Sequence, residues 1–137
     1  MNVLQKIAPE WPLRLGLGIM YLWSGIDITL YPTAWYWALR SLPQNLQGFV
    51  TASVSIDTFF RLQGVSEILL AFLLLAWFLP RIFPLFAALV ATLEFAAILA
   101  FLPINAITFR DIGLLGGALT LFLIILKDHR GPNSTKS

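Results

Sequence analysis

Four long apolar stretches dominate this 137-residue chain and limit what it can fold into. Each is long enough to cross a hydrocarbon core of about 30 Å as an α-helix. Prolines 32, 80 and 103 lie between the stretches, where a helix would end. We therefore expect an all-α integral membrane protein, a single-domain four-helix bundle with up-down-up-down topology. The predicted spans are residues 13–31, 58–79, 82–102 and 106–126, followed by a polar tail at 127–137.

The composition excludes several other classes of protein. Hydrophobic residues make up 58% of the chain and charged residues only 12%, whereas a typical soluble domain is about a quarter charged. This balance rules out a disordered chain, a nucleic-acid binder and an ordinary cytosolic protein. There is no cysteine and one histidine, His129, so we expect no metal site and no intrinsic cofactor. Any redox role would then need a diffusible organic cofactor or partner subunits.

Basic residues predict the orientation in the membrane. Six lysines and arginines lie on the side of the membrane that holds the two termini. The other side holds Arg40, with Arg61 and Arg110 at or just inside the spans. Cytoplasmic loops carry an excess of lysine and arginine, so we expect both termini in the cytoplasm. Arg14 is expected to snorkel to this interface as an anchor. The six basic residues on the side of the termini, at the chain ends and at the turn between the second and third spans, are Lys6, Arg14, Arg81, Lys127, Arg130 and Lys136.

One long connection, residues 32–57, is predicted on the non-cytoplasmic side. It contains Trp35 and Trp37 in an aromatic run. This loop is interpreted either as a cap over a site between the helices or as an aromatic belt on a short interfacial helix, and both can hold together. At its end, Asp57 or alternatively Ser55 is expected to cap the next helix.

Every predicted span carries a carboxylate, which is costly in a membrane at about 2.5–3.5 kcal/mol each. Counting about 1.5 Å per residue from the span ends places these acids and two arginines in the outer half of the bilayer. This convergence indicates a ligand or proton site, or a ring of charges that holds the helices in register. The six residues are Asp27, Glu67, Glu94, Asp111, Arg61 and Arg110.

Helical spacing places small and charged residues on common faces, which we expect to point inward. We expect Arg110 to pair with Glu67 or Asp27. Because four acids face two arginines, one or two acids, Glu94 foremost, are expected to be neutral at pH 7. The stripes are Gly16, Met20, Ser24, Asp27 and Tyr31, then Gly64, Glu67 and Ala71, then Ala87, Ala91 and Glu94, and finally Arg110, Gly113 and Gly117.

Short motifs follow one another along the chain: LRLGLG at 13–18, YLWSG at 21–25, GVSE at 64–67 and RDIGLLG at 110–116. In this order they resemble the DoxX/DoxD family of small four-helix membrane proteins, which includes the small subunit of thiosulfate:quinone oxidoreductase. The resemblance implies membrane redox chemistry. One departure is Asp27, which stands where many relatives carry a basic residue. The positions carried over from the family are Arg14, Gly64, Glu67, Arg110 and Asp111.

The first functional hypothesis is quinone-linked oxidation of a small sulfur compound, in which Glu67 or Glu94 moves the proton that quinone reduction needs. The alternative is a non-enzymatic integral subunit whose glycine-rich faces contact partner membrane or redox subunits, or another copy of the chain. A small transporter or proton path is a third hypothesis, disfavoured because no inverted repeat is evident. The candidate catalytic residues are Glu67, Arg110, Asp111 and Glu94, and the candidate substrate-binding residues are Asp27, Arg61 and Arg110.

Overall fold

The computed structural model describes residues 7–130, which form helices and loops with no strand in this range. The predicted all-α class is therefore confirmed. Lys6, Lys136 and the last residues of the predicted tail lie outside the described residues. The elements are α1 (Glu10–Leu30), the 3₁₀ helix η2 (Pro32–Trp35), α2 (Tyr36–Arg40), α3 (Gln44–Ser53), α4 (Ile56–Leu75), α5 (Ile82–Phe101) and α6 (Thr108–His129).

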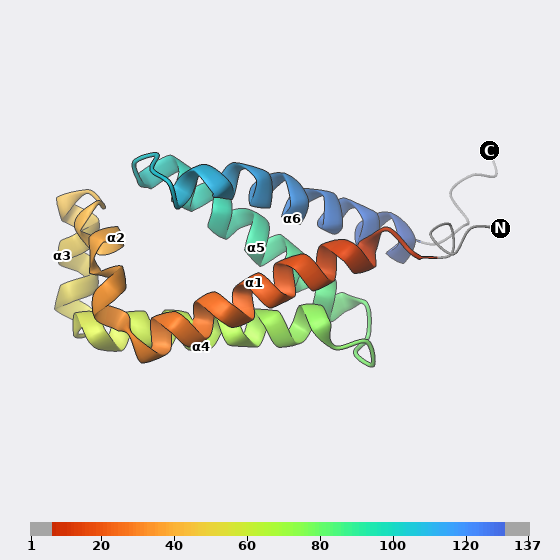
Figure 1. Ribbon diagram of the computed structural model, residues 1–137, viewed down its shortest axis with the longest axis horizontal. Coiled ribbons are helices and arrows are strands. Elements are labelled where there is room, and N and C mark those ends of the chain that lie inside the picture. Colours follow the sequence, from red (N-terminus) through yellow and green to blue (C-terminus); the bar gives the residue numbers. More distant parts are fainter. Residues whose placement is uncertain (1–6, 131–137) are drawn as a thin grey trace.

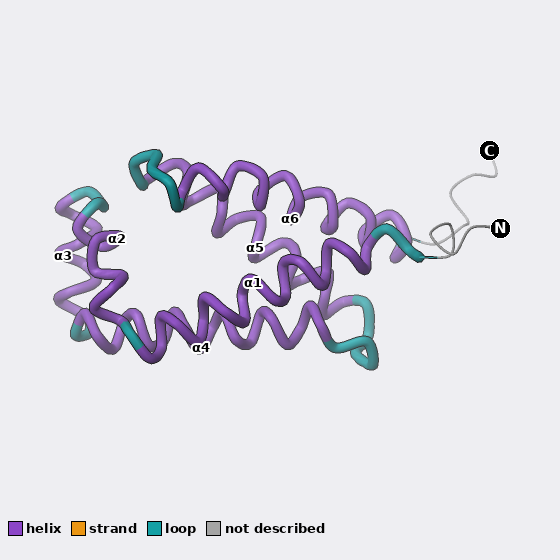
Figure 2. Tube along the Cα trace, in the orientation of Figure 1, coloured by secondary structure: helices purple, strands orange, loops and turns teal. Residues whose placement is uncertain are grey.

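The four long helices run alternately in opposite directions, as the predicted topology requires (Figure 1). They associate as two pairs, α1 with α4 and α5 with α6. The pairs lie close together where α4 leads into α5 and diverge toward the end that carries α2 and α3 (Figure 2). Because the pairs diverge, the space between them at that end has to be filled or covered by other groups.

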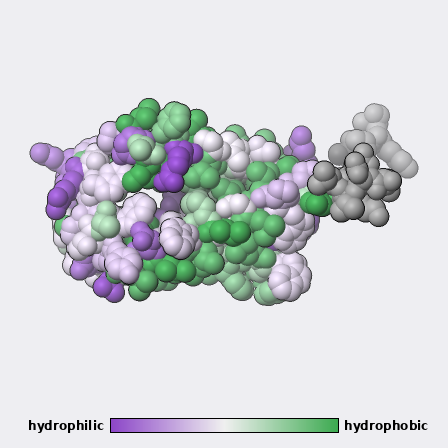
Figure 3. All heavy atoms as spheres, viewed as in Figure 1, coloured by the Kyte–Doolittle hydropathy of each residue, from purple (hydrophilic) through white to green (hydrophobic). Residues whose placement is uncertain are grey.

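Three of these helices, α4, α5 and α6, are long and apolar enough to cross a membrane. Helix α1 has a similar length but carries Glu10, Arg14 and Asp27, and it is not among the three. Apolar residues cover much of the middle of the molecule, whereas polar residues gather around α2 and α3 (Figure 3). These features indicate a membrane protein.

Helix α4 ends at Leu75, before the predicted boundary at residue 79, and Arg14 binds this end. The Arg14 guanidinium donates hydrogen bonds to the carbonyl oxygens of Leu74 at 2.7 Å and Ala76 at 3.1 Å. Those carbonyls have no partner within the helix. Arg14 is only 5% exposed, with Trp11 stacked on it, so the prediction that it snorkels to the interface is wrong.

Glycines set how closely α1 and α4 approach. A Cβ atom added to Gly25 would lie 2.7 Å from the carbonyl oxygen of Gly64, and one added to Gly64 would lie 2.7 Å from that of Gly25. The two backbones therefore touch, and a side chain at either position would push the helices apart. Tyr21, one helical turn before Gly25, lies on the same face of α1 and is buried.

The predicted inward stripes are confirmed for α4 and α5, hold only in part for α1, where Ser24 reaches Glu67, and are wrong for α6. On α4, Gly64, Glu67 and Ala71 are buried, and on α5 the two alanines of the stripe are fully buried. On α1, by contrast, Gly16 is exposed, and on α6 Gly113 is exposed. The buried residues of α1 are Glu10, Arg14, Leu17, Gly18, Tyr21, Gly25 and Ile28, and those of α6 include Thr108, Ala118, Leu121 and Ile125.

Polar contacts tie the helix ends together. Arg81, just before α5, forms ion pairs with Glu10 at 2.9 Å and with Asp128 at 3.1 Å. The start of α1 and the end of α6 therefore lie at one end of the molecule. At the other end Ser55, and not Asp57, caps α4, because its hydroxyl accepts a hydrogen bond from the Thr58 amide at 3.2 Å.

Candidate functional site

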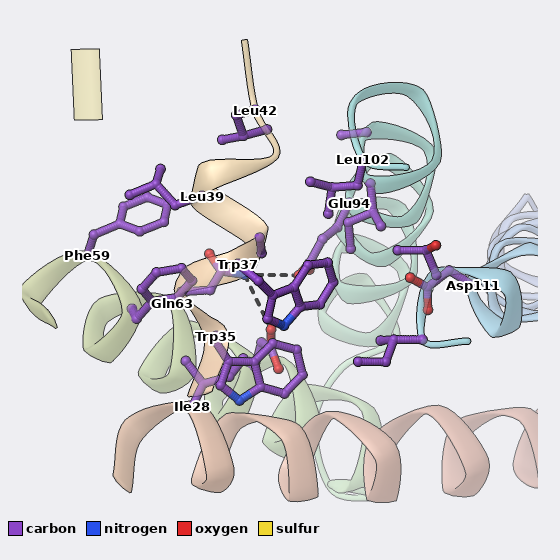
Figure 4. A pocket seen from close by; sticks show the side chains of 17 residues that line it. Ile28, Trp35, Trp37, Leu39, Leu42, Phe59, Gln63, Glu94, Leu102 and Asp111 are labelled. Atoms are coloured by element: carbon purple, nitrogen blue, oxygen red, sulfur yellow. Dashed lines mark hydrogen bonds between the residues drawn. The ribbon is translucent and has the colours of Figure 1, made fainter. Parts of the chain in front are cut away.

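A cavity of about 250 Å³ lies between the diverging helix pairs, beneath α2 (Figure 4). Its wall is mostly apolar and rich in aromatic side chains, including Trp35, Trp37 and Phe59. The polar residues in the wall are Gln63, Glu67, Glu94, Asp111 and Thr108. The sequence-based interpretation of the 32–57 connection as a cap over a site between the helices agrees with this arrangement.

A hydrogen-bonded cluster links the two glutamates of the cavity. The Gln63 amide donates to Glu94 Oε1 at 3.0 Å and to Glu67 Oε1 at 3.4 Å. The Ser24 hydroxyl donates to the other oxygen of Glu67, and the Tyr21 hydroxyl donates to Glu94 Oε2 at 3.2 Å. The cluster therefore joins α1, α4 and α5, and one amide holds two acidic groups on facing helices.

The carboxyl groups of this cluster are not paired with arginine. Among the described residues, the ion pairs are those of Arg81 with Glu10 and Asp128, at the far end of the molecule. Glu67 is only 6% exposed, so its carboxyl group is held by hydrogen bonds from neutral donors alone. Removing two like charges from water without a cation is costly. That one of these acids is neutral at pH 7 therefore stays a prediction.

The predicted pairing of Arg110 with Glu67 or Asp27 is wrong, because of how α6 begins. Thr108 is fully buried: its hydroxyl donates to the Pro103 carbonyl at 2.8 Å, and its amide donates to Asn105 Oδ1 at 3.0 Å. With Thr108 facing inward, a residue two positions later lies on the opposite side of the helix. Arg110 is accordingly exposed, whereas Asp111, three positions on, lines the cavity.

The other predicted substrate-binding residues also lie outside the cavity wall. Asp27 accepts a hydrogen bond from the Trp35 indole at 2.8 Å, so it positions a wall residue. Arg61 is exposed on α4. Of the predicted catalytic residues, Glu67, Glu94 and Asp111 line the cavity together. Their catalytic roles stay predictions.

Sequence reasoning singled out neither Gln63 nor the Tyr21 hydroxyl as a site residue. Gln63 precedes Glu67 by one helical turn, and Tyr21 precedes Ser24 by three residues. Helical spacing alone would have placed each near the acidic cluster. Glutamine carries no charge, so the balance of charges within the spans does not identify Gln63 as a site residue.

Helix α2 covers the cavity and is held there by its own contacts. Leu39 packs with Ile28 and Phe60, and the Tyr36 ring stacks on Phe60 with centroids 5.8 Å apart. The Tyr36 hydroxyl also donates a hydrogen bond to Asp57, and this bond raises the pKa of Tyr36 above its ordinary value. The roof of the site is thus attached to the first turn of α4.

The fold and the site together define an all-helical protein of membrane type with an acidic cluster beside an apolar cavity. Among the described residues, no group of three or more histidine, cysteine, aspartate or glutamate side chains could hold a metal ion. No protein-family model, curated protein sequence or solved structure matches the chain. The resemblance to the DoxX/DoxD family therefore rests on the sequence motifs.

Proposed function

We propose that the chain is a four-helix integral membrane protein of DoxX type whose cavity binds a quinone or a similar neutral ring compound for membrane redox chemistry. The observation that carries this proposal is the pair Glu67 and Glu94, held together by Gln63 at the wall of an apolar, aromatic cavity. Ionisable groups inside membrane helices are expensive and are usually retained for function.

The chemistry of the wall suits a flat, uncharged ring. Trp35, Trp37 and Phe59 offer aromatic faces, against which a ring stacks or packs edge-on. The amide of Gln63 and a protonated carboxyl group can each donate a hydrogen bond to a carbonyl oxygen. Reduction of a quinone to a quinol places a proton on each such oxygen, so a carboxyl group beside it can act as the acid.

The charge of the wall disfavours an anion. Its ionisable members are Glu67, Glu94 and Asp111, and no lysine or arginine of the described residues lines it. The resemblance implies a small sulfur compound as electron donor. An anion such as thiosulfate would have to deliver its electrons from outside the cavity or through a partner subunit.

The test separates ligand binding from proton transfer in the purified protein in mild detergent. Binding of a short-chain benzoquinone, followed by quenching of tryptophan fluorescence, should weaken about tenfold in Gln63→Leu, which loses a hydrogen-bond donor. Glu94→Gln keeps a donor of the same shape, so it should bind normally but lose thiosulfate-dependent quinone reduction by about tenfold or more. The matched control Gln44→Leu makes the same change at an exposed position of α3 that does not line the cavity, and it should change neither quantity.

The opposite outcome is also informative. Equal quinone affinity in the parent protein, Gln63→Leu and a Glu94→Leu variant, all with the same melting temperature, would refute a quinone site in this cavity. The alternative of a non-enzymatic subunit would then gain weight. Exposed Gly113 and Gly116 have open space beside them on α6, where a partner helix could approach closely. Copurification with a stoichiometric membrane partner would support that alternative.

A further inference from the structure

A second hollow lies on the outside of the molecule, between α4 and α5. It is a groove of about 530 Å³ whose wall includes the exposed apolar side chains of Leu69, Phe86 and Leu93. These residues lie well inside the two helices, each of which is long and apolar enough to cross a membrane. With α4 and α5 across the bilayer, the groove faces hydrocarbon.

The groove and the interior cavity share two wall residues, Gln63 and Glu94. The hydrogen bond between them, 3.0 Å long, crosses from α4 to α5 and lies between the two spaces. These helices belong to different pairs, so this bond closes a gap between the halves of the bundle. A polar bridge at a groove that faces lipid is costly to maintain, which points to a role beyond packing.

The two spaces differ in size and chemistry in a way that suits one molecule with two parts. The cavity, at about 250 Å³, is below the range of about 300–1,000 Å³ usual for ligand pockets, so it suits a ring-sized head group. It supplies the hydrogen-bonding groups. The wall of the groove is apolar except for Gln63, Ser66 and Glu94, which suits a hydrocarbon chain.

We propose that the groove between α4 and α5 is a lateral portal from the hydrocarbon to the cavity, closed by the hydrogen bond between Gln63 and Glu94. The ligand is an amphiphile with a hydrogen-bonding ring head, which occupies the cavity, and one apolar chain, which lies in the groove. This inference rests on the proposed function and adds to it the substrate class and the route of access.

The test blocks the groove chemically. Because the sequence has no cysteine, a single cysteine can be labelled uniquely. Leu93→Cys is labelled with a bulky, non-fluorescent apolar maleimide in phosphatidylcholine vesicles. The matched control is Leu119→Cys, which replaces another exposed leucine, on α6, that lines neither space. Trp11→Phe, Trp23→Phe and Trp77→Phe in all samples leave the wall residues Trp35 and Trp37 as the source of the fluorescence.

The readout is quenching of that fluorescence by benzoquinones with a long or a short apolar chain, compared at equal mole fraction in the bilayer. We expect the label at residue 93 to slow quenching by the long-chain compound about tenfold, and the label at residue 119 to leave the rate unchanged. In unlabelled protein the long-chain compound should bind about tenfold more tightly than the short-chain one, because its chain also occupies the groove.

Each contrary result identifies what fails. Unchanged quenching rates after labelling residue 93, with normal quenching of unlabelled protein, would overturn the portal and leave the cavity as a ligand site. Equal affinities for the two compounds would overturn the placement of the chain in the groove. Failure of both quinones to quench unlabelled, folded protein would refute the proposed function, and the portal with it.

Discussion

Gly25 and Gly64 occupy the point where α1 and α4 touch, and each would place a Cβ atom 2.7 Å from the other's carbonyl oxygen. The spacing of small residues placed Gly64 on the inner face of its helix. It did not identify Gly25 as its partner, because the partner depends on how α1 is rotated. The close contact at these two glycines brings Ser24 on α1 within hydrogen-bond reach of Glu67 on α4.

Replacing Gly64 with alanine should therefore destabilise the protein. The added methyl group meets backbone atoms that cannot rotate away, and such overpacking costs about 1–3 kcal/mol. Gly113→Ala is the control, because nothing lies within 4 Å of its added Cβ. Thermal unfolding in mild detergent should show a lower midpoint temperature for Gly64→Ala than for the parent protein, and an unchanged midpoint for the control. Equal midpoints would contradict the close contact of α1 with α4.

Helix α2 acts as a roof because its contacts reach two other elements. Trp35, directly before it, is held by Asp27 of α1, and Tyr36 is held by Asp57 of α4. The aromatic run had two sequence-based interpretations, a cap or an interfacial belt. The structure supplies the cap, since Trp35 and Trp37 line the cavity.

The bond of Tyr36 to Asp57 predicts a pH dependence of this roof. The pKa of Tyr36 is raised in the folded protein, so the stabilisation is fully present below the ordinary tyrosine value of about 10 and is lost as the pH rises through the raised value. Above that point a phenolate faces a carboxylate. Acrylamide quenching of the wall tryptophans Trp35 and Trp37, with Trp11→Phe, Trp23→Phe and Trp77→Phe in the background, should stay low to pH 10 and increase at higher pH.

Two variants check this assignment. In Tyr36→Phe the bond is absent at every pH, so the wall tryptophans should be more accessible at pH 7 and should show no further transition. Tyr31→Phe removes an exposed tyrosine whose hydroxyl forms no hydrogen bond with the described residues, and it should behave like the parent. A transition that persists in Tyr36→Phe would assign the pH dependence to another group.

The whole molecule has two chemically different ends. Arg14, Arg81 and Lys127 lie toward the end where α1 starts and α6 finishes, and Arg40 lies at the end formed by α2 and α3. The positive-inside rule then predicts that the first of these ends faces the cytoplasm. The prediction includes a crossing by α1, the most polar of the long helices.

Single cysteines test this arrangement directly. With a membrane-impermeant maleimide added to intact cells, we expect Gly48→Cys in α3 to be labelled and Ala8→Cys and Trp77→Cys to be protected until the cells are opened. All three positions are exposed in the structure. Labelling of both Ala8→Cys and Gly48→Cys from the same side would show that α1 does not cross. Labelling of Ala8→Cys and Trp77→Cys alone would invert the orientation.

The sequence by itself determined the helical class, the number of long helices and the presence of acidic groups within them. Long apolar runs interrupted by proline specify helices, and the alanine and glycine stripes of α4 and α5 identified their inner faces correctly. Only the tertiary structure decided the rotation of α1 and α6, and with it the partners of the acids. The physical reason is that in a membrane-type helix both the lipid-facing and the buried side are apolar, so periodicity does not distinguish them. Contacts such as those of Gly25 with Gly64 and of Thr108 with Pro103 determine which side of each helix is buried, and they form only when the chain has packed.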